Sequence, residues 1–143
     1  MAESDVTSPP SRLRIGRKDY RLMLDHLWST YPQEGCGLLA GKDGNVARIY
    51  TVENRLASPT AYEMDPQQQL EAMLDIEDQG SELLAIFHSH PGGPDVPSAT
   101  DIATAYYPEA AYVIVSYYDP DRPTARAFTV FEGRVEEISI IIA

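Results

Sequence analysis

The sequence predicts a single α/β domain in which a mixed sheet is combined with three helices. Its 143 residues are the length of one compact domain, and neither an internal repeat nor a linker divides them. Segments with the two-residue period of strands alternate with segments of helical period, which is typical of α/β layers. The last three strand-like segments are joined by short turns, so this part of the sheet should be antiparallel.

The N-terminal third begins with a polar tail. Residues 1–11 contain two adjacent prolines and no apolar cluster, so we expect a disordered tail, with the folded domain starting at residue 12 and ending at 143. Residues 12–15 alternate between polar and apolar and predict a short strand. A helix is predicted over 17–31, where Pro32 ends it. Its apolar and aromatic stripe should face the core and consists of Tyr20, Met23, Leu24, Leu27, Trp28 and Tyr31.

The middle of the chain predicts a strand, a tight turn and a second strand. The strands cover 36–41 and 46–52, and the turn is residues 42–44. Asp65 precedes a proline and, three residues on, a glutamine, which is the pattern of a helix N-cap. The helix that follows should end at Gly80.

The C-terminal half begins with a continuously apolar segment, 83–87, which predicts a strand buried on both faces. Residues 91–97 are rich in proline and glycine and must form a loop. A short helix is expected from Ser98 to about residue 106. Three more strands are predicted, at 112–118, 125–131 and 135–141.

Composition excludes several classes of protein. The 22 acidic residues against 11 basic ones give a net charge of −11, which opposes binding to nucleic acid or to anionic membranes. The one cysteine, Cys36, excludes an internal disulfide and a cysteine-rich metal cage, and we expect it to be a small buried apolar residue. The chain has neither a signal-peptide pattern nor an apolar run long enough to span a membrane. A soluble, cytoplasmic domain is expected.

Two of the three histidines, His88 and His90, directly follow the apolar strand. Residues two apart on a strand face the same side, so both imidazoles could bind one metal ion. The alternative is a pair of surface histidines at a strand end. Asp101 could add a third ligand from the first helical turn, leaving a fourth position for water. However, Ser98 and Asp101 also have capping-box spacing, and a helix start alone could explain them.

Hydrolysis at such a metal also needs a base for the water. Glu34 lies just before the predicted strand at 36–41, but spacing alone does not single it out from the other acidic residues.

Together these residues resemble the motif of the JAMM (MPN-plus) zinc metalloprotease family. The motif consists of a glutamate, then His-x-His, seven further residues and Ser-x-x-Asp, and the chain matches every position: Glu34, His88, His90, Ser98 and Asp101. The segment 34–41 also looks like the start of the compact bacterial members. The resemblance covers about residues 13–140.

The resemblance implies a role for each of these residues. His88, His90 and Asp101 would bind one catalytic Zn²⁺. Glu34 would take a proton from the zinc-bound water and pass it to the leaving amine, and Ser98 would donate a hydrogen bond to the oxyanion. The implied fold is similar to that of cytidine deaminases, with a curved, mostly antiparallel sheet flanked by helices.

The implied substrate is a ubiquitin-like or sulfur-carrier protein, cut at the amide bond after its C-terminal glycines. A non-catalytic scaffold of the same fold is the alternative, although scaffolds usually lack some of the ligands. A nucleobase deaminase would need a Cys-x-x-Cys pair, which a chain with one cysteine lacks.

Overall fold

The computed structural model describes residues 8–143, so most of the expected tail, residues 1–7, lies outside the described part. The domain start at residue 12 stays a prediction. The seven strands are β1 (Arg12–Ile15), β2 (Cys36–Lys42), β3 (Asn45–Val52), β4 (Glu82–His90), β5 (Ala111–Ser116), β6 (Thr124–Phe131) and β7 (Arg134–Ile142). The three helices are α1 (Arg17–Thr30), α2 (Pro66–Asp78) and α3 (Ala99–Ala103). Within residues 8–143, no helix is both long and apolar enough to cross a membrane.

The strands form one mixed sheet in the order β1-β3-β2-β4-β5-β6-β7, closed as a barrel. Four of its pairings are antiparallel, including β5–β6 and β6–β7, as the short turns predicted. The expectation of a curved sheet needs correction, because β1 pairs with both β3 and β7 and closes the circle. The strand is short, and its pairing with β3 is a single register position, Arg14 opposite Asn45. A four-residue strand at the chain start was therefore enough to turn a curved sheet into a barrel.

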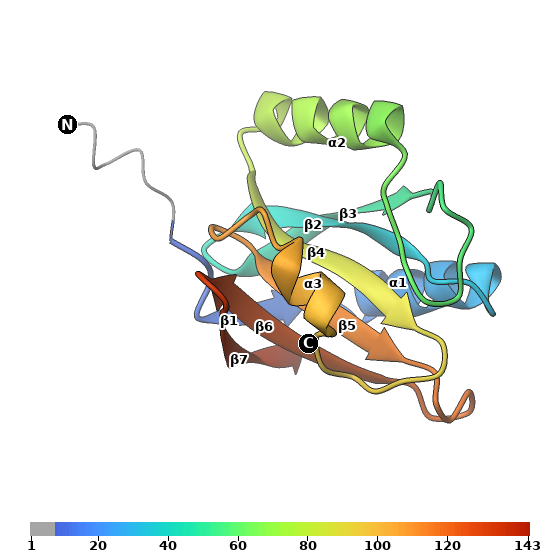
Figure 1. Ribbon diagram of the computed structural model, residues 1–143. Helices are drawn as coiled ribbons and strands as arrows, with labels where there is room; N and C mark the ends of the chain where they lie inside the picture. Colours follow the sequence, from blue (N-terminus) through green and yellow to red (C-terminus); the bar gives the residue numbers. More distant parts are fainter. Residues whose placement is uncertain (1–7) are drawn as a thin grey trace.

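The sheet has apolar clusters on its two sides, and a long helix packs on each. One cluster contains Met23 and Leu27 of α1 together with Phe87 of β4. The other contains Ala72 and Ile76 of α2. Figure 1 shows α2 lying along one side of the sheet, well apart from α1. β4 belongs to both clusters because alternate side chains point to opposite sides, which explains its continuously apolar sequence.

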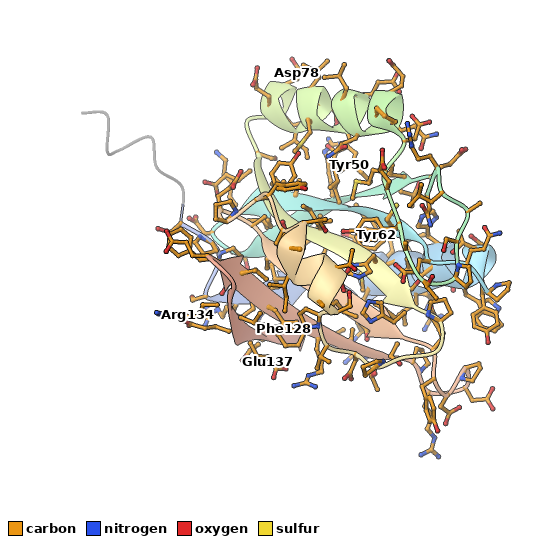
Figure 2. All side chains as sticks on the ribbon, viewed as in Figure 1. Tyr50, Tyr62, Asp78, Phe128, Arg134 and Glu137 are labelled. Carbon is orange, nitrogen blue, oxygen red and sulfur yellow. The ribbon has the colours of Figure 1, made fainter. Side chains whose placement is uncertain are left out.

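Both long helices expose some apolar residues, so helical periodicity alone does not identify which residues are buried. Trp28 in the last turn of α1 and Tyr31 just after it are 48% and 39% exposed rather than in the core. Their rings stack on each other and contact Tyr117. In α2, Leu70 and Leu74 are also exposed. The helix turns Ala72 and Ile76 to the sheet, and Tyr50 reaches up from β3 to donate a hydrogen bond to the Asp75 carboxylate at 2.6 Å (Figure 2).

The helix starts follow the local signals. Asp65 accepts a hydrogen bond from the backbone N–H of Gln68 at 2.9 Å, the predicted N-cap of α2. Ser98 caps α3, but α3 ends at Ala103, three residues before the predicted end, and has no buried residue. Five residues are too few for a stable isolated helix, so α3 depends on its cap, on contacts with the site and on the partly buried Ile102, which packs against the same apolar cluster as α2.

Candidate metal centre

His88 and His90 form the end of β4, where the strand register fixes them. His88 lies opposite Cys36 of β2 and Ile114 of β5, and His90 lies beside Ser116 of β5. Both are buried, 1% and 8% exposed, and their Nε2 atoms are 3.1 Å apart. The prediction that the two imidazoles share one side of the strand is confirmed. The alternative of two surface histidines is wrong, because the strand end lies inside the fold.

Asp101 completes a three-membered cluster from the first turn of α3. Its Oδ2 lies 3.2 Å from His88 Nε2 and 3.0 Å from His90 Nε2. The same oxygen accepts the backbone N–H of Ser98 at 2.9 Å, and the Ser98 Oγ accepts the backbone N–H of Asp101 at 3.0 Å. The capping box is therefore real, and it also aims the carboxylate at the histidines. The capping interpretation is confirmed, and the same geometry leaves Asp101 placed to serve as the third ligand that was predicted.

The three atoms have the spacing that a small cation requires. Tetrahedral ligands 2.0–2.1 Å from zinc lie about 3.3 Å from one another. The three separations here are 3.0, 3.1 and 3.2 Å, so little movement would bring these atoms into coordination range. Imidazole nitrogen and carboxylate oxygen are also donors that zinc accepts. The residues fit a four-coordinate cation with one position left open.

Electrostatics around the cluster favours a bound cation. Burial alone would raise the pKa of Asp101, but hydrogen bonds with His88 and His90 hold it well below its usual range. Burial lowers the pKa of His88, which favours the neutral imidazole that metals bind. For His90 burial also lowers the pKa, yet its bonds to Asp101 and to a backbone carbonyl outweigh burial and raise it. These bonds favour the protonated imidazole, and a proton on Nε2 competes with a metal for that atom.

Glu34 precedes β2 and is buried, with 5% exposure. Its position depends on the neighbouring segment of β4, since Gly35 donates its N–H to the Ser89 Oγ at 2.8 Å and accepts the Ser89 N–H at 3.1 Å. Ligand atoms of Glu34, His88 and His90 all lie within 4.8 Å of one another. Glu34 is thus beside the cluster, while Asp101 makes the shorter contacts. Burial raises the pKa of Glu34 to about 7, with the negative Asp101 adding to the effect and His90 opposing it.

Three supporting groups were missed by the sequence analysis. Ser89 is 1% exposed, and its burial within an apolar strand was a signal that it needs a partner. The Pro94 carbonyl accepts the Nδ1 proton of His90 at 2.7 Å. The Tyr62 ring stacks on His88 at 4.5 Å between centroids (Tyr62 is labelled in Figure 2). Neither of these last two had a sequence signal, because both come from irregular loops.

A cleft of about 410 Å³ opens onto this site. Figure 1 shows that the loop between β3 and α2 reaches the end of β4, where residues 91–97 begin. The cleft lies between these two loops, and its lining residues are Glu34, Pro59, Thr60, His90, Pro91–Pro94 and Val96–Ser98. Most of these side chains are small or cyclic, so the cleft walls leave room for an extended chain beside the site.

The other candidates stay outside the site. Cys36 is fully buried, and burial raises the pKa of its thiol to about 12, so it is the small apolar residue that was expected. His26 lies on α1, and its Nε2 is 2.9 Å from the Cys36 carbonyl oxygen.

Comparison with known proteins agrees with this geometry. Residues 17–130 match the family described as prokaryotic homologs of the JAB domain. The chain belongs to this family. The resemblance to compact bacterial JAMM proteins is therefore confirmed.

The relatives of this prokaryotic JAB protein include three whose names describe an activity. It is 37% identical over 117 residues to the CysO-cysteine peptidase of Mycobacterium tuberculosis, covering 80% of each chain. It is 40% identical over 118 residues to a probable TtuB-protein conjugate cleaving protease of Thermus thermophilus, covering 82% of this chain and 74% of that one. A desampylase of Haloferax volcanii is 39% identical over 115 residues, covering 78% and 79%.

Solved structures share the fold. A solution structure from Desulfitobacterium hafniense superposes with a TM-score of 0.83 and 36% identity over 92% of each chain. A JAB1/MPN domain protein from Archaeoglobus fulgidus gives a TM-score of 0.59 over 90% of this chain and 99% of that one, at 19% identity. This second likeness shows that the fold is of the JAB/MPN type.

Proposed function

We propose that this protein is a zinc-dependent peptidase that hydrolyses the amide bond after the C-terminal glycine of a ubiquitin-like or sulfur-carrier protein. The observation that carries the proposal is the triangle of ligand atoms, 3.0–3.2 Å on each side, with the Glu34 carboxylate beside it. His88, His90 and Asp101 would hold the metal. Zinc, when bound there, lowers the pKa of a coordinated water to about 7 and polarises the scissile carbonyl.

The remaining residues supply proton transfer and charge stabilisation. A carboxyl with a pKa of about 7 is suited to take a proton at neutral pH and to return it to the leaving amine. Ser98 uses a lone pair of Oγ in the cap, so its hydroxyl proton stays available for the carbonyl oxygen of the substrate as that oxygen gains negative charge. Water adds across the amide, giving a carboxylate on the carrier and a free amine.

The substrate class has support from the cleft and from the relatives. The names of three relatives refer to a CysO–cysteine bond, to TtuB conjugates and to desampylation. The cleft beside the metal site, lined in part by prolines and glycines of residues 91–97, leaves room for an extended glycine tail. We therefore propose a small carrier protein as the substrate.

The test is to incubate the protein with a carrier–cysteine amide and a carrier–lysine isopeptide and to score the products by mass. We expect release of the carrier with a free C-terminal glycine, loss of this activity on chelation, and recovery with one Zn²⁺ per chain. A protein that holds one zinc per chain and cleaves neither adduct would be a scaffold of the same fold, and the proposal would be wrong.

A further inference from the structure

The two metal-site histidines are oriented by different means. His90 donates its Nδ1 proton to the Pro94 carbonyl at 2.7 Å, whereas His88 Nδ1 has no hydrogen-bond partner among residues 8–143. A second hydrogen bond from a ligating imidazole sets both its tautomer and the direction of its other nitrogen. The direction of His90 Nε2 therefore depends on where the Pro94 carbonyl lies.

Pro94 belongs to the loop of residues 91–97, which contains neither helix nor strand. At its start the loop is tied to the strand, since Gly93 donates its N–H to the His90 carbonyl at 2.9 Å. Beyond Pro94 the next side chain, Asp95, is bound to the barrel. Its Oδ2 accepts the Thr124 hydroxyl at 2.8 Å, and its Oδ1 accepts Nη1 of Arg126 at 3.2 Å. Thr124 and Arg126 lie two apart on β6 and so share one face of the strand.

Arg126 is itself fixed by the neighbouring strand. Its Nε and Nη2 bind the two carboxylate oxygens of Glu137 on β7 at 2.9 and 2.7 Å, a two-point contact that sets the plane of the guanidinium. The guanidinium also lies 5.4 Å from the centre of the Phe128 ring. Figure 2 shows Phe128 and Glu137 on the side of the molecule opposite α2. Exposed ion pairs add little stability, so the geometry of this network matters more than its energy.

We propose that Asp95 is a positioning residue for His90: by holding residues 91–97 to Thr124 and Arg126 of β6, it keeps the Pro94 carbonyl in place to accept the Nδ1 proton. The network attaches a loop that has no regular structure to the hydrogen-bonded pair of strands β6 and β7. The proposal rests on the proposed function only in that His90 is taken to be a metal ligand. The positioning itself is a property of the metal-free chain.

The main test is the Nδ1 proton of His90 in the Zn²⁺-loaded D95A variant, read from ¹H–¹⁵N spectra of the imidazole ring together with the Zn²⁺ affinity. In the unmodified chain with Nε2 on the metal, the Nδ1 proton should be held by the Pro94 carbonyl and exchange slowly with solvent. We expect D95A to speed this exchange and to weaken Zn²⁺ binding about tenfold, the lower end of what loss of a supporting bond costs. D95N keeps an oxygen for Thr124 and should have a smaller effect.

T124V, which removes one hydroxyl at nearly constant volume, is the second variant in case D95A folds poorly. D121N, in the exposed turn between β5 and β6, is the matched control and should change neither the proton exchange nor the affinity. If the folded D95A and T124V variants keep both the slow exchange of the His90 Nδ1 proton and the Zn²⁺ affinity, Asp95 does not position His90, and the proposal is overturned even if melting temperatures fall. Because proton exchange and Zn²⁺ affinity are measured without substrate, this result stands apart from any failure to find peptidase activity.

Discussion

The candidate metal centre is built from two halves that differ in how they are held. The barrel half consists of Glu34, His88 and His90, all buried at strand ends. The helix half consists of Ser98 and Asp101, from a five-residue helix with no buried residue. Strand pairing fixes the end of β4, with β2 as far as His88 and with β5 as far as His90. A capping box, contact with the histidines and the packing of the partly buried Ile102 hold the helix half. The barrel half is therefore set before a metal binds, and the helix half depends partly on the site itself.

The largest effect should come from breaking the contact between the halves. D101N keeps an oxygen for the capping box but loses the charge, so we expect Zn²⁺ affinity to fall by more than about 100-fold and activity to vanish. The fold should survive, because α3 adds no buried residue to the core. H88A should also lose the metal but melt at a lower temperature, since it leaves a cavity in the barrel.

Zinc content by mass spectrometry and thermal melts check this comparison. D78N, at the exposed end of α2, is the matched control and should keep both metal and activity. Retention of zinc by D101N would remove Asp101 from the ligand set, and equal destabilisation by D101N and H88A would contradict the division into two halves.

The next largest effect should show whether Glu34, in the barrel half, acts as the catalytic base or as a metal ligand. E34Q should keep its zinc, because Asp101 makes the shorter contacts to the histidines, while turnover falls about 100- to 10,000-fold with loss of the proton carrier. Turnover and metal content measured on the same sample decide this. E136Q on β7 serves as the control, and a zinc-free E34Q would instead make Glu34 a ligand.

In the helix half, a comparison of two cap variants separates the capping role of Ser98 from its catalytic role. S98A and D65A each remove an N-cap and should cost about 1 kcal/mol of unfolding free energy. Only S98A should also lower turnover, by about 100-fold, because only Ser98 can donate to the substrate oxygen. Equal turnover in the two variants would leave Ser98 with a capping role alone.

The smallest effect is on the stability of the metal-free protein as pH changes. The pKa of Glu34 rises from 4.5 to about 7 on folding, so the folded chain binds this proton more tightly. Its contribution to stability is fully present below pH 4.5 and is lost as pH rises through about 7. E34Q resembles the protonated carboxyl, so it should match the unmodified chain at pH 4 and be more stable at pH 8. Urea denaturation at both values checks this, and equal stability at pH 8 would mean that the Glu34 pKa is not raised.

Local patterns predicted the elements well because their signals lie within a few residues. The N-cap at Asp65 and the apolar strand before His88 needed no distant partner to be recognised. Helical periodicity was less successful at predicting which face of each helix is buried. Trp28 and Leu70 lie on the predicted helices but are exposed, because helical spacing alone does not specify what each helix packs against.

The sequence by itself determined the chemical groups of the site and the pairing of two histidines, since residues two apart on a strand must share a side. Only the tertiary structure decided that Asp101 reaches both Nε2 atoms, that Gly35 and Ser89 bring Glu34 beside them, and that β1 closes the barrel. The physical reason is sequence distance. Gly35 and Ser89 are separated by 54 positions, and contact across such a length follows from strand pairing rather than from any local preference.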